Sequence, residues 1–138
     1  MNTLFDIEVG HSLETISIKN VPSIWITRYA EVSKDFNPIH IDQEAAQQKG
    51  FDQPIVHGML TMGFTGRILS SYMNAHLLIE QMNVMFLAPL QVGEGVELTG
   101  VVKEKSVAEV KVEVTGMSSS GHRVIRGEIV VKNRKINS

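Results

Sequence analysis

Cysteine is absent from this 138-residue chain. A disulfide scaffold, thiol catalysis and cysteine-ligated zinc are therefore excluded. Long apolar runs are also missing, because the most apolar stretch, IVHGMLTMGFTGRILSSYM, is interrupted by His57, three glycines and Arg67. It predicts no membrane span. The opening residues MNTLFDIEVG lack a basic region followed by an apolar run, so we expect no signal peptide and a cytoplasmic protein.

A concentration of basic charge is missing as well. Thirteen basic and fifteen acidic residues give a net charge of −2, and the basic residues form no cluster. Binding to nucleic acid needs concentrated Lys and Arg to neutralise phosphates, so no nucleic-acid partner is expected. The length predicts one domain over residues 1–138, large enough to form a core without disulfides or metals.

Helical patterns occupy the first half, after a short strand-like opening from Ser12 to Val21. Ser23 is the expected N-cap of a helix over IWITRYAEVS. Its expected buried face comprises Ile24, Trp25, Ala30 and Val32. Asp42 is the expected N-cap of a short helix, QEAAQQK, that ends at Gly50. A third helix is predicted over 58–73, and its apolar residues on nearly all sides indicate a buried helix.

Alternation of apolar and polar residues marks the second half. One set of alternating positions is apolar and is expected to face the core: Val96, Leu98, Val110, Val112, Val114, Ile125, Ile129 and Val131. This period of two predicts strands with one buried and one wet face, joined by polar turns at 103–106 and 117–122. The fold class predicted is α+β, with an antiparallel sheet around one long apolar helix.

A cluster of chemically active side chains stands at residues 35–42, DFNPIHID. A carboxylate and an imidazole that hold the same water can activate it and also supply a proton. Imidazole exchanges protons near neutral pH. The Asn37-Pro38 turn is expected to let Asp35 and His40 converge, whereas a straight strand would place them on opposite faces. Asn37 is expected to order this non-helical loop by hydrogen bonds to backbone.

The dipeptide His57-Gly58 stands where the third helix is expected to begin. The first N–H groups of a helix have no intrahelical partner and lie at its positive dipole end. The Gly58 N–H is therefore predicted to stabilise a developing oxyanion, and a glycine there leaves room for a substrate. His57 is interpreted as a supporting residue that binds neighbouring carbonyls.

Three segments resemble the MaoC-like, (R)-specific enoyl-CoA hydratase family. They are YAEVSKDFNPIHID (29–42), FDQPIVHGML (51–60) and FLAPLQVGEGVELTG (86–100), and the resemblance extends over about residues 10–132. Two features depart from that family. Lys34 replaces a small residue before Asp35, and Gly63 and Gly66 occupy positions where relatives often carry a serine, with Thr61 and Thr65 nearby.

The resemblance implies a hot-dog fold, in which a curved antiparallel sheet wraps around a central helix. It implies reversible hydration of a trans-2-enoyl thioester by Asp35 and His40, with the carbonyl oxygen at the Gly58 N–H. No cofactor is implied, since CoA or an acyl carrier protein only carries the substrate. A homodimer or higher oligomer is implied, with the acyl chain against the helix and the dimer partner.

Other functions remain open from the sequence. A hot-dog thioesterase would direct the water at C1 instead of C3, and a non-catalytic acyl-thioester-binding module would not need both Asp35 and His40. Each residue also has an ordinary structural interpretation, such as a turn, a cap or a surface imidazole. A metal site from Asp35, His40 and Asp42 is not expected, because no second histidine is near in the sequence.

Overall fold

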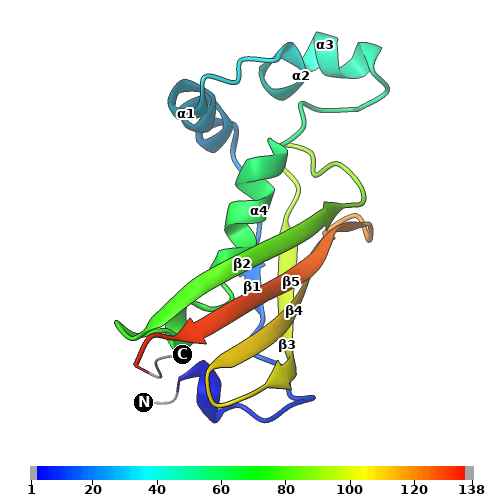
Figure 1. Cartoon of the computed structure of the whole chain (residues 1–138). Coiled ribbons are helices and arrows are strands. Elements are labelled where there is room, and N and C mark those ends of the chain that lie inside the picture. The colour runs from blue at the N-terminus through cyan, green and yellow to red at the C-terminus, as the bar shows by residue number, and fades with distance from the viewer. Residues whose placement is uncertain (1–2, 136–138) are drawn as a thin grey trace.

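An antiparallel sheet of five strands forms the body of the computed structural model, which describes residues 3–135 (Figure 1). The strands follow the order β1-β3-β4-β5-β2 across the sheet. Their bounds are β1 (Ile16–Ile18), β2 (Leu77–Phe86), β3 (Val96–Lys105), β4 (Glu109–Ser118) and β5 (Arg123–Asn133). Strand β2 and the short strand β1 are the two edges of this sheet.

The alternating pattern of the second half is confirmed as strands with one buried face. Val110, Val112 and Val114 on β4 have no exposed surface. The strands run further than predicted, because β3 reaches Lys105, which pairs with Val110, so most of the expected turn at 103–106 belongs to the sheet. The turn at 117–122 is also shorter, since β4 continues to Ser118.

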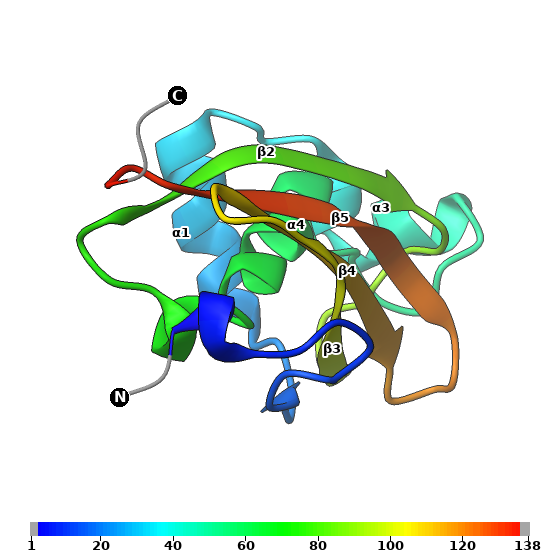
Figure 2. The same cartoon turned by 60° about the horizontal axis from the view of Figure 1, so that its bottom comes forward.

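Four α-helices accompany the sheet, and the curved sheet wraps around one of them, α4 (Figure 2). Their bounds are α1 (Ser23–Ser33), α2 (Pro38–Ile41), α3 (Gln43–Gln48) and α4 (Gly58–Gly66). Helices α1, α2 and α3 lie beyond the end of the sheet, near the start of α4 (Figure 1). Single-turn 3₁₀ helices stand at Leu4–Asp6 and Ser70–Tyr72.

Helix α1 has a narrower buried face than predicted. Ala30 is buried as expected, together with Ile26. The other three residues of the predicted face are exposed, at 50% for Ile24, 38% for Trp25 and 83% for Val32. The reason is position, since α1 lies past the end of the sheet and only one side of it meets the core. The N-cap is Pro22, and Ser23 is already the first helical residue, so that prediction was also wrong.

Helix α4 is shorter and less enclosed than predicted. It ends at Gly66 and gives way to turns and the 3₁₀ helix at Ser70–Tyr72, consistent with the low helix propensity of glycine. Phe64 and Thr65 are buried, whereas Met59 is 62% exposed, so one side of the first turn is open. Within residues 3–135, no helix combines the length and apolar composition needed to cross a membrane.

The predicted cap of α3 is confirmed, whereas the predicted opening strand is shorter than expected. Asp42 caps α3 as expected, because its Oδ1 accepts a hydrogen bond from the Glu44 N–H at 3.1 Å. Gly50 follows with a φ of 93°, a conformation that glycine adopts without strain. The opening strand, expected over Ser12 to Val21, is only β1, with a separate bridge between Ser12 and Val101.

Candidate active site

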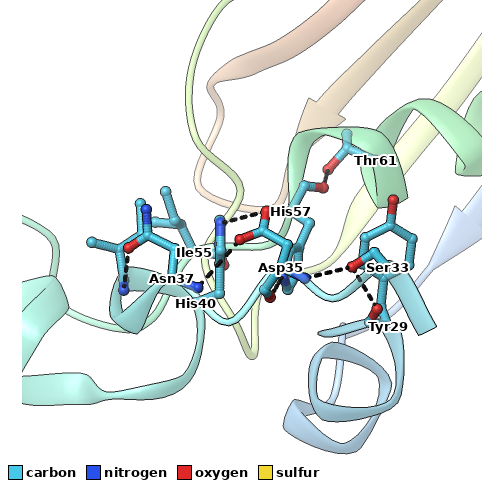
Figure 3. A network of polar contacts seen from close by, with 9 residues as sticks. Tyr29, Ser33, Asp35, Asn37, His40, Ile55, His57 and Thr61 are labelled. Carbon is cyan, nitrogen blue, oxygen red and sulfur yellow. Dashed lines mark hydrogen bonds and ion pairs between the residues drawn. The ribbon is translucent and has the colours of Figure 1, made fainter. Parts of the chain in front are cut away.

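Asp35 stands in the loop after α1, and hydrogen bonds fix both its backbone and its carboxylate (Figure 3). The chain turns out of α1 at Lys34, whose φ is 64°. The Ser33 hydroxyl donates to the Tyr29 carbonyl at 2.7 Å and accepts from the Asp35 N–H at 3.3 Å. Carboxylate Oδ1 accepts from the Asn37 N–H at 3.2 Å. The second carboxylate oxygen, Oδ2, is left for another partner.

His40 lies in a helix where a non-helical turn was predicted. Asn37 is the N-cap of α2, and its Oδ1 accepts from the Ile39 N–H at 3.3 Å. Pro38 takes the first helical position, where its fixed φ is already suitable and its missing N–H costs nothing. Asn37 therefore orders the loop through a backbone hydrogen bond, as expected, but it does so by starting a helix.

The imidazole of His40 is oriented by the chain just before α4. Its Nδ1 lies 2.7 Å from the Ile55 carbonyl oxygen, and a carbonyl can only accept, so Nδ1 carries a hydrogen. The other nitrogen, Nε2, lies 3.9 Å from Asp35 Oδ2. That separation is too long for a direct hydrogen bond. The structure thus brings the predicted pair together, with 10% of the His40 side chain and 50% of the Asp35 side chain exposed.

His57 supports both members of this pair. It is 2% exposed, and its Nε2 lies 3.0 Å from the Asp35 carbonyl oxygen, so the expected carbonyl contact is present. Its ring also stacks on His40, with centroids 3.8 Å apart and planes 23° apart. Tyr29 packs against it at 4.9 Å. Within the part of the chain described, His57 Nδ1 is buried without a hydrogen-bond partner.

Gly58 is the first residue of α4, and its N–H has no acceptor within residues 3–135. It lines a pocket of about 380 Å³ together with His40. The remaining walls are mainly apolar and include Val56, Phe86 and Leu87. Thr61 also lines the pocket, where its hydroxyl donates to the His57 carbonyl at 3.4 Å. One cavity therefore contains an imidazole, a free helix-start amide and an apolar wall.

The donor atoms of Asp35, His40 and His57 lie within 4.8 Å of one another. In the metal site that was considered from the sequence and not expected, Asp42 was the third ligand. Asp42 instead caps α3, and the residue that joins the pair is a histidine from another element. One nitrogen of each ring faces a backbone carbonyl. Stacked rings also direct their in-plane lone pairs side by side and not toward one point, which suits a metal ion poorly.

The fold and the enzyme class follow from comparison with known proteins. The fold is the hot-dog fold, and the relatives that match most of this chain's length are named hydratases or dehydratases, which confirms the hydro-lyase class. The model of the MaoC like domain matches residues 6–122. The chain belongs to this MaoC-like family, as its sequence motifs indicated.

Two relatives illustrate the range of similarity. The (R)-specific enoyl-CoA hydratase of Rhodospirillum rubrum is 30% identical over 131 residues, which are 91% of this chain and 88% of that protein. The mitochondrial 3-hydroxyacyl-[acyl-carrier-protein] dehydratase of Arabidopsis thaliana is 37% identical over 86 residues, 62% of this chain. This chain spans only about half the length of the Arabidopsis relative.

Among solved structures, the (R)-hydratase from A. caviae involved in PHA biosynthesis superposes with a TM-score of 0.82 and 26% identity. The match covers 92% of this chain and 97% of that one. The unliganded R-hydratase PhaJ1 from Pseudomonas aeruginosa gives the same TM-score at 22% identity, covering 92% of this chain and 82% of that one.

Proposed function

We propose that this protein is an (R)-specific enoyl-CoA hydratase or 3-hydroxyacyl-CoA dehydratase, which adds water reversibly to a trans-2-enoyl thioester. One geometric observation carries the proposal: Asp35 Oδ2 and His40 Nε2 face each other at 3.9 Å, and His40 shares its pocket with the unpaired Gly58 N–H. The activities of the relatives from R. rubrum and Arabidopsis agree with this reaction.

Asp35 and His40 are proposed to hold the water that reacts. A water about 2.8 Å from each atom would sit at the apex of a triangle above the gap between them. Because Nδ1 of His40 carries its hydrogen, Nε2 has a lone pair that can accept a proton from this water. The hydroxide equivalent then bonds to C3, and the proton held by the pair passes to C2, so atoms and charge balance.

Gly58 is proposed to stabilise the negative charge that appears during this addition. As C3 is attacked, electrons move through C2 and C1 onto the thioester oxygen. An N–H at the start of α4 can donate to that oxygen, and the helix dipole there favours negative charge. No cofactor is part of the proposal, because groups of the chain supply both the proton transfers and the oxyanion contact.

Crotonyl-CoA distinguishes this function from the two alternatives. Loss of the enoyl absorbance without release of free thiol, together with an (R)-3-hydroxybutyryl product, is the expected result. Release of thiol would identify a thioesterase. Binding of the acyl-CoA with neither reaction would identify a non-catalytic module, and either of these outcomes overturns the proposal.

A homodimer that pairs two β2 edges is proposed as the minimal assembly. Strand β2 is an edge strand, so one side of its backbone lacks partners from the sheet. It exposes large apolar residues outside the pocket, namely Leu78, Ile79 and Met85. Pairing through this edge would cover them and extend the sheet. The carrier, CoA or acyl carrier protein, and the cytoplasmic location stay predictions.

A further inference from the structure

Phe86 occupies an unusual place at the end of β2. Its partner across the sheet is Ile125 of β5, which is fully buried on the inner face. Residues directly opposite each other in an antiparallel pair share a face, so Phe86 points inward as well. The chain is held just beyond it, because the Leu87 N–H donates to the Val124 carbonyl at 2.9 Å. The base of the side chain is therefore fixed by the sheet.

The tip of the Phe86 ring touches the start of α4. A Cβ atom added to Gly58 would lie 3.3 Å from Cζ of this ring and 3.5 Å from Cε1 and Cε2. The space on the Cβ side of Gly58 is thus already taken by an aromatic ring, which is a second reason for a glycine here beside the room that a substrate was expected to need. Although Phe86 points inward, it is 50% exposed. Its open part borders the pocket that contains His40 and Gly58.

This position determines what the ring can contact in a bound thioester. If the thioester oxygen accepts from the Gly58 N–H, the ring lies beside the atoms bonded to the carbonyl carbon. These atoms are the sulfur and C2. The sulfur is the same in every thioester substrate, whereas C2 carries either a hydrogen or a branch. A rigid aromatic ring at this point leaves room for a hydrogen on C2 and excludes a branch there.

We infer that Phe86 is a specificity-determining residue that restricts the site to enoyl thioesters unbranched at C2. This inference rests on the proposed hydratase function and names the substrates that the site accepts. Phe86 takes no part in proton transfer. It limits the width of the site beside the Gly58 amide.

The test compares crotonyl-CoA with 2-methylcrotonyl-CoA, which differ by one methyl group on C2. The wild type is expected to have the higher kcat/KM for crotonyl-CoA. Phe86→Ala removes the ring and should reduce this preference by about tenfold or more, the usual scale for one methyl group in an apolar pocket. Phe86→Leu retains an apolar side chain for folding and should give an intermediate preference.

Met85→Ala is the matched control. Met85 is the preceding residue on β2 and is 56% exposed, but it pairs with Arg126 and lies on the opposite face of the sheet. The ratio of kcat/KM for crotonyl-CoA to kcat/KM for 2-methylcrotonyl-CoA should be the same in Met85→Ala as in the wild type. Sedimentation and circular dichroism would show that all three variants keep the wild-type assembly and fold.

The outcomes separate the inference from the function on which it rests. A wild type that hydrates neither substrate overturns the proposed function. A wild type that hydrates both equally well overturns the inference alone. So does an active Phe86→Leu or Phe86→Ala variant with an unchanged ratio, because a purely structural role would lower both activities in proportion.

Discussion

The ring of His57 stacks on the ring of His40, with centroids 3.8 Å apart, while its Nε2 lies 3.0 Å from the backbone carbonyl of Asp35. One buried side chain therefore contacts both members of the proposed catalytic pair. His57 is also the N-cap of α4, so the helix that begins at Gly58 and the loop that carries Asp35 are positioned by the same residue. The proposed water site and the proposed oxyanion site are consequently held together by one buried side chain.

Replacing either member of the pair should remove activity and leave the fold intact. Asp35→Asn and His40→Ala are each expected to lower kcat on crotonyl-CoA by about a hundredfold or more, the usual size of an acid–base contribution. The Asp35 side chain is half exposed, so its replacement leaves no buried gap. Asp42→Asn is the matched control, because asparagine caps a helix as well as aspartate. Near-full turnover by either pair variant would contradict the assignment.

The oxyanion role of Gly58 can be tested with two substitutions that add the same Cβ. Gly58→Ala keeps the N–H, whereas Gly58→Pro removes it at a first helical position that tolerates proline. The ψ of 135° at His57 also suits a following proline. In both variants the added Cβ would lie in the same place against the Phe86 ring, so this contact does not distinguish them. We expect Gly58→Pro to lower kcat by about 10²–10³-fold more than Gly58→Ala. Equal kcat values in the two variants would rule out the N–H contact.

The strands were predicted well from the sequence because the alternation that marks a strand depends only on neighbouring residues. Alternation along β4 is a property of successive residues, and it identified Val110, Val112 and Val114 as buried. The spacing of Asp35 and His40 likewise suggested that they converge, although the intervening Asn37-Pro38 starts a helix and not a simple turn. A proline at the first position of a helix is the signal that could have indicated α2.

The features that could not be predicted from the sequence depend on contacts between residues that are far apart along the chain. Ile24 and Val32 look like core residues, but α1 lies beyond the end of the sheet, so their exposure follows from the placement of the whole helix. The ring of His57, at the start of α4, stacks on the ring of His40 in α2, and the Ile55 carbonyl orients the His40 ring. The contact of Phe86 with Gly58 joins β2 to α4. No local periodicity encodes such pairs.

His57 should contribute to stability as well as to the site. His57→Ala leaves a cavity beneath His40 and removes the hydrogen bond to the Asp35 carbonyl. Loss of a buried ring and one hydrogen bond predicts a decrease of about 2–3 kcal/mol in the free energy of unfolding. Urea denaturation measures it as a lower midpoint at an unchanged slope. His11→Ala, at an exposed position, should change it by less than about 0.5 kcal/mol. Equal midpoints for the two variants would contradict this account.

The proposed dimer can be weakened at the β2 edge without touching the pocket. Leu78 and Ile79 are 47% and 38% exposed near the start of β2, at the opposite end of the strand from Phe86. Leu78→Lys combined with Ile79→Lys places charged groups in an apolar contact that gives them no partner, so the dissociation constant should rise by at least about tenfold. Sedimentation equilibrium measures the change, with Val107→Lys at an exposed turn as the control. A monomeric wild type would disprove this assembly.

Lys34 occupies a backbone conformation that favours glycine. Its φ of 64° and ψ of 20° place it in the left-handed region, the one non-glycine residue with positive φ within residues 3–135. The crowding of Cβ there costs about 1–2 kcal/mol. Glycine relieves this strain but gains about 0.4–1 kcal/mol of entropy in the unfolded chain. Lys34→Gly should therefore raise the free energy of unfolding by about 0.5–1 kcal/mol.

The matched control for this substitution is Lys34→Ala, which removes the charge and the long side chain but keeps Cβ, and which should leave stability unchanged within about 0.5 kcal/mol. Thermal or urea unfolding of the two variants compares them directly. If alanine stabilised the protein as much as glycine, the lysine side chain and not its backbone would be the source of the strain. Turnover should stay at the wild-type level in both, because Asp35 is held by Ser33 and Asn37 independently of the residue at position 34.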